Sequence, residues 1–248
     1  MGRRWSTLER ELREAYGPHL AGVDEVGRGP LAGPVVACAV IMPADARVIP
    51  GIDDSKALDK KERDRLARLI HRRALATSVA AASVREIDRL NIYHATSLAI
   101  RRALDRLRVR PDHVVLDGKA IRALPYEHTA VVGGDAACYS VACASILAKV
   151  TRDRVMHSLA RRYPGYGWES NVGYGTRTHL DGLRGLGTTR HHRRSFMPVQ
   201  QLAFDLMSIE APVPDAPALL EADEAVRLAE DVFCETPAHA WQPPATGE

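Results

Sequence analysis

The sequence predicts an α/β fold with a mixed sheet flanked by helices, and three observations lead to this prediction. Short apolar runs rich in Val and Ala alternate with stretches whose apolar residues recur at helical spacing. Glycine-containing turns follow several of these runs. The chain has 248 residues and 46% hydrophobic content, so one domain can bury a sizeable core. No second domain is required.

The N-terminal half is expected to alternate strands with helices. Strands are expected at 20–24, 34–42 and 77–83. Between the last two, Asp59 and Glu62 form an aspartate variant of a capping box, which opens a helix. Two further helices are expected at 84–90 and 94–107, and the second ends before Pro111 because the residue preceding a proline disfavours helix.

The C-terminal half places two acidic residues directly after short strands. A strand at 113–116 delivers Asp117 at its carboxyl end, where open α/β sheets usually bind ligands. A second short strand at 131–132 is followed by a Gly-Gly turn into Asp135. A long helix is expected at 139–162. Both carboxylates are therefore candidate site residues.

The chain divides into three regions. A helical extension spans 1–19, the main domain spans 20–204, and an acidic, Pro-containing tail spans 205–248. Within the tail, a Pro-rich linker precedes a short acidic helix expected at 219–233.

The formal charge of +3 hides a strong asymmetry along the chain. Residues 1–148 hold 23 Lys+Arg against 18 Asp+Glu, residues 149–204 hold 10 against 3, and residues 205–248 hold 1 against 10. A basic block beside acidic residues fits a polyanion such as nucleic acid. A solvated helix face is the alternative interpretation. For the acidic tail we hypothesise either disorder or competition with nucleic acid for the basic region.

Cysteine usage and the N-terminus indicate a reducing compartment. The four cysteines form no C-x-x-C pair and lie mostly inside apolar runs, as small buried hydrophobic residues do. Arg3-Arg4 is followed by a charged segment instead of the apolar stretch of an export signal. The longest apolar stretch, 31–42, is too short to span a bilayer. We therefore expect a cytoplasmic protein.

One segment places two adjacent carboxylates beside a glycine turn. Asp24 and Glu25 end the first apolar run, and Gly27-Arg28-Gly29, here called the glycine-arginine turn, follows at once. Carboxylate oxygens suit Mg²⁺ or Mn²⁺, and glycines let main-chain N–H groups approach a phosphate or a sugar hydroxyl closely. The segment indicates metal-assisted chemistry on a nucleic-acid backbone, whereas an isolated Asp-Glu pair is more often a solvated strand end.

Five further segments follow this one along the chain. They are DDSK at 53–56, VVLDGK at 114–119, GD at 134–135 leading into ASILAKVTRD at 144–153, GYGT at 173–176 and HHRRSF at 191–196. In this order and at these separations the six segments closely resemble bacterial ribonuclease HII, the type 2 ribonuclease H that cuts RNA embedded in or paired with DNA. The resemblance runs from about Gly22 to about Val199.

The resemblance implies a ribonuclease H-like fold with a helical C-terminal portion that completes the substrate groove. Asp24, Glu25, Asp117 and Asp135 match the family's four catalytic, metal-binding carboxylates position by position. Their like charges would repel without a cation. In the two-metal scheme one ion activates the attacking water and the other stabilises the leaving oxygen. For Asp135, satisfying backbone donors at a helix N-terminus is an alternative role, and both roles can coexist.

Other positions are expected to bind substrate. In the family, the glycine-arginine turn and Tyr174 are associated with the 2′-hydroxyl of the ribonucleotide whose 3′ side continues into DNA. Ser145, Lys149 and Arg152 fall at i, i+4 and i+7, so one helix face can present them to successive phosphates. Lys149 can instead pair with Asp153. Further phosphate candidates are Lys56, Arg193 and Arg194. For the histidine pair at 191–192 we prefer phosphate contact or packing to zinc binding.

The expected activity is hydrolysis of the RNA strand of RNA/DNA hybrids and cleavage 5′ to single ribonucleotides in duplex DNA, leaving 3′-OH and 5′-phosphate ends. Gly133 and Val172 stand where the family commonly has lysine, which puts substrate affinity in doubt. The alternatives are another ribonuclease H-like nuclease and a binding module with vestigial acids. Exonucleases of the fold typically carry Asp-x-Glu, and four intact acids argue against a binding module. A type 3 enzyme normally has an extra N-terminal domain, for which the residues before Asp24 leave no room.

Partners follow from the same resemblance. The expected substrate is an RNA/DNA hybrid or a DNA duplex containing ribonucleotides, and a monomer suffices for a single groove. Residues 201–204 faintly resemble a sliding-clamp ligand, although helix core is the preferred interpretation.

Overall fold

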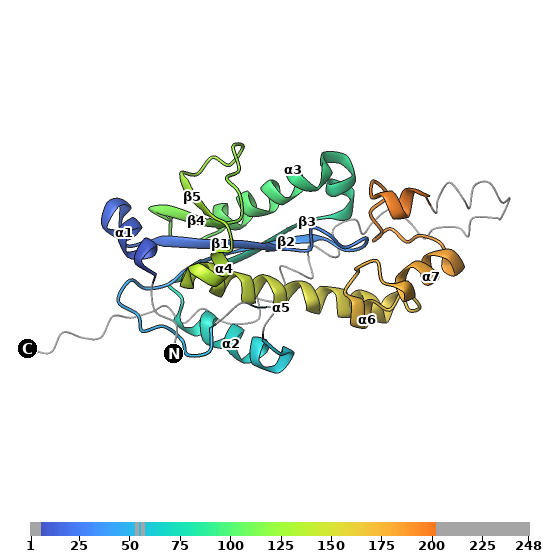
Figure 1. Ribbon diagram of the computed structural model, residues 1–248, viewed down its shortest axis with the longest axis horizontal. Helices are drawn as coiled ribbons and strands as arrows, with labels where there is room; N and C mark the ends of the chain where they lie inside the picture. The colour runs from blue at the N-terminus through green and yellow to red at the C-terminus, as the bar shows by residue number, and fades with distance from the viewer. Residues whose placement is uncertain (1–5, 53–54, 56–57, 202–248) are drawn as a thin grey trace, which may run out of the picture.

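A mixed five-stranded sheet forms the centre of the computed structural model, which describes residues 6–52, 55 and 58–201 (Figure 1). The strands are β1 (Leu20–Val26), β2 (Val35–Ile41), β3 (Ala76–Ala82), β4 (His113–Asp117) and β5 (His128–Val131), in the spatial order β3-β2-β1-β4-β5. β2 is antiparallel to β1 and β3, whereas β4 is parallel to β1 and β5. The carboxyl ends of β1 and β4 therefore lie at the same edge of the sheet.

Helices cover both faces of the sheet. They are α1 (Thr7–Tyr16), α2 (Lys60–Arg73), α3 (Val84–Asp105), α4 (Gly134–Ala137), α5 (Tyr139–Arg162), α6 (Trp168–Asn171) and α7 (Arg177–Leu186). Figure 1 shows α3 on one face and α5 with α2 on the other, while α6 and α7 continue from the far end of α5. Each face has its own buried apolar cluster. The predicted mixed α/β fold with a helical C-terminal portion is confirmed.

Helix α5 lies directly against β1 because β1 has no side chain at Gly22. A Cβ placed there would lie 2.2 Å from the carbonyl carbon of Ser140 in α5, a distance that no real Cβ tolerates. Side chains two residues apart share a face of a strand, so Asp24 is also directed at α5. The close approach therefore sets α5 beside the first acidic residue.

Helix α3 contains the break that the sequence predicts between 84–90 and 94–107. Asn91 has φ 65° and ψ 167°, outside helical geometry. Its Oδ1 accepts hydrogen bonds from the backbone N–H groups of Tyr93 and His94 at 2.9 and 3.2 Å, which caps the second half of the helix. The second half ends at Asp105, two residues before the predicted end.

The N-terminal helix α1 is tied to the central helix α5 by a buried carboxylate. Ser6 and Glu9 form a capping box at the start of α1. The Glu9 carboxylate is 0% exposed and also accepts from the backbone N–H groups of Tyr139 and Ser140 at 2.9 and 2.8 Å. Because these N–H groups open α5, one side chain caps two helices.

Several predicted boundaries need correction. β1 continues to Val26, so Asp24 and Glu25 lie within the strand and not at its last residue. The strand expected at 131–132 is β5, which begins at His128; its half-buried, partly polar residues do not form an apolar run. The predicted helix at 139–162 matches α5 at both ends. The tail helix expected at 219–233 lies outside the described residues.

In the part of the chain that the structure describes, no helix is long and apolar enough to cross a membrane.

Candidate active site

Asp24 and Asp117 are brought together by the parallel pairing of β1 and β4. Val23 is the register partner of Leu116, so the next residue of each strand is the acidic one. Asp24 is 7% exposed and its Oδ1 accepts from the N–H of Glu25 at 2.7 Å, whereas Asp117 is half-buried. Two of the four predicted carboxylates thus stand side by side at the carboxyl edge of the sheet.

The turn before α4 brings the fourth carboxylate to the same edge. Gly133 adopts a left-handed conformation with φ 70°, and the N–H of Gly134 donates to Asp117 Oδ1 at 2.7 Å. Asp135 follows directly and is 8% exposed, with its Oδ1 accepting from the N–H of Ala136 at 2.9 Å. The predicted backbone-capping role of Asp135 is therefore present beside its candidate catalytic role.

Burial and electrostatic repulsion both disfavour the charged form of Asp24. Burial, together with the neighbouring Glu25 and Asp117, raises the pKa of Asp24 to about 8, while a hydrogen bond from Ser145 opposes this shift. Burial also raises the pKa of Glu25, although Arg28 opposes the shift. A divalent cation would relieve this repulsion, and carboxylate oxygens are the donors that Mg²⁺ and Mn²⁺ prefer. Within the described ranges no three His, Cys, Asp or Glu side chains already stand in metal-binding positions.

Ser145 contacts the carboxylate and not the surface. Its side chain is 5% exposed, hydrogen-bonds Asp24, and lies 2.9 Å from the hydroxyl of Ser55. The prediction that Ser145 faces a phosphate is therefore corrected, because its hydroxyl is enclosed between α5, β1 and the segment that carries Ser55. Lys56, in the same segment, lies outside the described residues.

The glycine-arginine turn and Tyr174 meet beside these carboxylates. Arg28 extends outward, with its side chain 53% exposed and its Nη1 3.3 Å from Glu25 Oε1. A Cβ placed on Gly29 would lie 3.6 Å from Cε1 of Tyr174, so the turn and the ring are direct neighbours. Tyr174 is 46% exposed although it is large and apolar in part. The two predicted ribose-binding features therefore form one accessible surface.

Arg152 and Arg193 do not form the phosphate contacts predicted from the sequence. Both side chains are 0% exposed. Each guanidinium group donates to backbone carbonyl groups of the segment that follows β1, and Arg152 also donates to the carbonyl of Val172. Arg194, in contrast, is exposed and stays a predicted phosphate contact.

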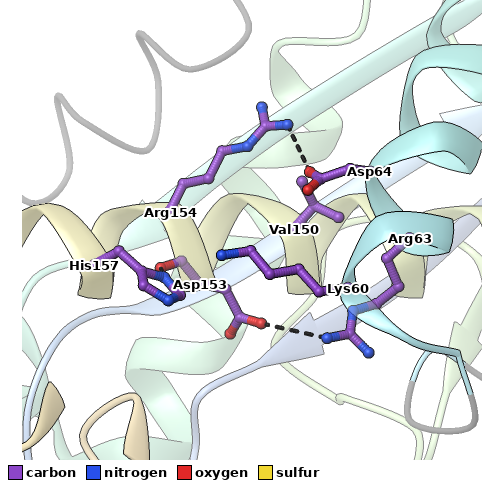
Figure 2. A pocket seen from close by; sticks show the side chains of 7 residues that line it. All are labelled: Lys60, Arg63, Asp64, Val150, Asp153, Arg154 and His157. Carbon is purple, nitrogen blue, oxygen red and sulfur yellow. Dashed lines mark hydrogen bonds and ion pairs between the residues drawn. The ribbon is translucent and has the colours of Figure 1, made fainter. Parts of the chain in front are cut away.

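Lys149 forms the ion pair that was the alternative to phosphate contact. Its Nζ donates to Asp153 Oδ1 at 2.8 Å. Asp153 also faces Arg63 at 3.9 Å across a small charged pocket between α2 and α5, where Arg154 pairs with Asp64 at 2.8 Å (Figure 2). Lys149 therefore belongs to a charge network that joins the two helices, and a phosphate contact by Lys149 stays a prediction.

The histidine pair is packed in the interior. Of the two preferred interpretations, phosphate contact and packing, the structure supports packing. His191 and His192 are 4% and 1% exposed. His192 Nε2 lies 3.0 Å from Nε2 of His179, whose Nδ1 lies 2.9 Å from the carbonyl oxygen of Tyr174. Sequence analysis did not single out His179, because no local pattern indicates that its partner is a carbonyl group of the Tyr174 turn.

The chain has clear relatives. A family model described as Ribonuclease HII matches residues 21–199. A curated ribonuclease HII from Granulibacter bethesdensis is 55% identical over 205 residues, which cover 81% of this chain and 93% of that protein. The crystal structure of ribonuclease H2 from Pyrococcus horikoshii matches with a TM-score of 0.66 at 25% identity, covering 76% of this chain and 98% of that one. Bst-RNase HIII in complex with Mn²⁺ shares the fold at 18% identity, with a TM-score of 0.55, covering 77% of this chain and 71% of that one.

Proposed function

This chain belongs to the ribonuclease HII family, and we propose that it cuts duplex DNA on the 5′ side of a single embedded ribonucleotide in addition to acting on RNA/DNA hybrids. Membership makes it a type 2 ribonuclease H, a hydrolase of the RNA strand of such hybrids. The proposal concerns the finer specificity. The observation that carries it is the position of Tyr174 next to the glycine-arginine turn, whose Arg28 lies beside Glu25 of the acidic cluster.

The four carboxylates hold the metal in this proposal. Asp24 and Asp117 ligate most directly, and Glu25 and Asp135 complete two sites. The donor set fits Mg²⁺ or Mn²⁺, because all four side chains offer carboxylate oxygens. Burial and the neighbouring carboxylates raise the pKa of Asp24, and a cation would offset both effects. When bound, such ions supply an activated water and charge stabilisation at the leaving oxygen. Arg28, held near Glu25, stands where it can contact the substrate backbone.

The ribose is recognised through its 2′-hydroxyl, which distinguishes RNA from DNA and can donate and accept hydrogen bonds. Backbone groups of the glycine-arginine turn can approach it because two of the three residues carry no side chain. The exposed Tyr174 ring closes the same surface from the other side. All-DNA duplexes lack this hydroxyl and are not cut.

We expect Tyr174→Phe to lower cleavage of a single embedded ribonucleotide more than cleavage of a long RNA/DNA hybrid. A hybrid offers a ribose at every register, so loss of one contact is partly offset by the number of binding positions. The measurement is kcat/KM on both substrates. Equal losses on the two would contradict the role of Tyr174.

The function itself is tested with an end-labelled DNA duplex containing one ribonucleotide, incubated with Mg²⁺ or Mn²⁺. The expected product is a single cut 5′ to the ribonucleotide, which is absent with EDTA and absent from the matched all-DNA duplex. An RNA/DNA hybrid serves as the positive control. Cleavage of the hybrid alone would remove the proposed specificity, and cleavage of neither would favour a binding module.

A further inference from the structure

Arg193 is a buried cation whose donors all serve the segment around the glycine-arginine turn. Its Nη1 and Nη2 donate to the carbonyl oxygens of Arg28 and Gly27 at 2.9 and 2.5 Å. Its Nε and Nη2 donate to the carbonyl of Gly33 at 3.0 and 2.8 Å. The planar fork of one guanidinium group thus fixes the carbonyl groups of two turn residues, and with them the direction of the neighbouring N–H groups.

Arg152 joins the same segment to the turn that follows α6 and leads into Tyr174. It donates to the carbonyl groups of Pro34 and Ala32 at 3.1 Å each and to that of Val172 at 2.9 Å. Its Nε also lies directly beside Gly27, where a Cβ would approach it to 2.1 Å. Arg152 therefore holds both halves of the ribose surface, the turn and the segment before Tyr174.

The two guanidinium groups are unusual because their hydrogen-bond acceptors are backbone carbonyl groups. Among the described residues, neither forms an ion pair with a carboxylate, and both are 0% exposed. Burial lowers the pKa of Arg152 to about 10 and that of Arg193 to about 9, so both stay charged at neutral pH. Burying two unpaired cations is costly. The hydrogen bonds from each planar guanidinium group to three carbonyl groups offset that cost. Neutral side chains of this size do not carry so many donors in one plane.

We propose that Arg193 and Arg152 are positioning residues for ribose recognition that do not touch the substrate: Arg193 fixes the carbonyl groups of the glycine-arginine turn, and Arg152 ties the same segment to the residues before Tyr174. This inference rests on the proposed function, in which that surface contacts the 2′-hydroxyl. A lysine at position 193 keeps the charge but cannot span three carbonyl groups with one planar fork.

The test compares Arg193→Lys with wild type on two substrates, a duplex with one embedded ribonucleotide and an RNA/DNA hybrid. The measured quantity is kcat/KM on the single-ribonucleotide duplex divided by kcat/KM on the hybrid. This ratio does not depend on the fraction of folded enzyme. Because misplacing a recognition group by about 1 Å can cost on the order of a hundredfold, the ratio should fall by roughly tenfold or more. Arg101→Lys, on the exposed surface of α3, is the matched control and should leave the ratio unchanged.

A double-mutant cycle with Tyr174→Phe separates positioning from general stability. If Arg193 acts through the surface that contains Tyr174, the double variant loses less than the product of the two single losses. An unchanged ratio in Arg193→Lys, or independent losses in the cycle, would overturn the inference while leaving the proposed function intact. Failure of wild type to cut the single-ribonucleotide duplex would overturn both. Should Arg193→Lys not fold, Arg152→Lys is measured in the same way with the same criteria.

Discussion

The charge of Asp117 is expected to affect both activity and stability. This residue faces Asp24 and raises the pKa of that buried carboxyl group, while its Oδ1 accepts from the N–H of Gly134. An asparagine keeps the oxygen for this hydrogen bond and removes the charge. The catalytic and structural contributions of the side chain can therefore be separated.

We expect Asp117→Asn to lower metal-dependent cleavage of an RNA/DNA hybrid by roughly a hundredfold or more, because metal-based charge stabilisation is worth several kcal/mol. Without metal, the free energy of unfolding should not fall, since repulsion with Asp24 is relieved. Cleavage assays and urea unfolding in EDTA measure the two effects. Asp181→Asn, at an exposed carboxylate of α7, is the control. Full activity in Asp117→Asn would refute the assignment of this residue as a ligand.

Some residues of the site could be identified from the sequence, and the roles of others could not. Asp24, Glu25, Asp117 and Asp135 could be singled out because each belongs to a short, local motif, and their role as metal ligands stays a prediction. The roles of Arg152 and Arg193 could not be predicted, because most of their acceptors lie 118 to 166 residues away along the chain. In the sequence, an arginine looks the same whether its guanidinium group meets a phosphate or three buried carbonyl groups.

Elements were predicted best where their ends carry local signals. The Asp59 cap and the break near Asn91 follow from side chains that form hydrogen bonds within four residues of themselves. β5 was predicted too short because its half-buried residues lack an apolar pattern and its position depends on pairing with β4. The contact of α1 with α5 depends on Glu9, whose capping box signals only the start of its own helix.

Glu9→Gln should destabilise the fold by about 2–3 kcal/mol. The carboxylate accepts hydrogen bonds with both oxygens, whereas an amide replaces one oxygen with an NH2 donor. A buried N–H group would then face another donor and stay unsatisfied. The carboxylate now receives the N–H groups of Tyr139 and Ser140 and the Ser140 hydroxyl. Urea unfolding of the variant measures the cost. Glu11→Gln, an exposed position on the same helix, is the matched control. Equal stabilities for the two variants would show that α1 is not anchored through Glu9.

The segment after α7 should make the fold sensitive to acid. Burial, followed by the nearby His179 and His191, lowers the pKa of His192 from 6.5 to about 3. Below pH 6.5 the unfolded state binds a proton that the folded state does not, so stability falls as pH decreases from about 6.5 towards 3. The stability difference between wild type and His192→Gln should therefore shrink by up to about 1.4 kcal/mol per pH unit in this range. Chemical unfolding between pH 4 and 8 measures it, and a constant difference would contradict the buried, neutral state.

Across the whole chain, a basic region is followed by an acidic C-terminal tail. Residues 149–204 carry a net charge of +7, and residues 205–248, which all lie outside the described residues, carry −9. The acidic cluster proposed to bind metal and the basic region expected to attract nucleic acid both belong to the part of the chain that matches the family, so a substrate backbone is expected to meet both. Because an acidic tail is attached to that part of the chain, its local concentration is high, and it is expected to compete with nucleic acid for the basic region.

Removal of residues 211–248 takes away eight acidic residues and one basic residue, which changes the net charge from +3 to +10. We expect the shortened chain to bind an uncleavable all-DNA duplex more tightly at low salt, because tail and DNA no longer compete for the same cations. The gain should diminish as salt concentration rises, since screening weakens both interactions. A full-length chain in which those eight acids are replaced by Asn or Gln separates charge from length and should bind like the shortened chain. Unchanged affinity at low salt in both variants would exclude competition by the tail.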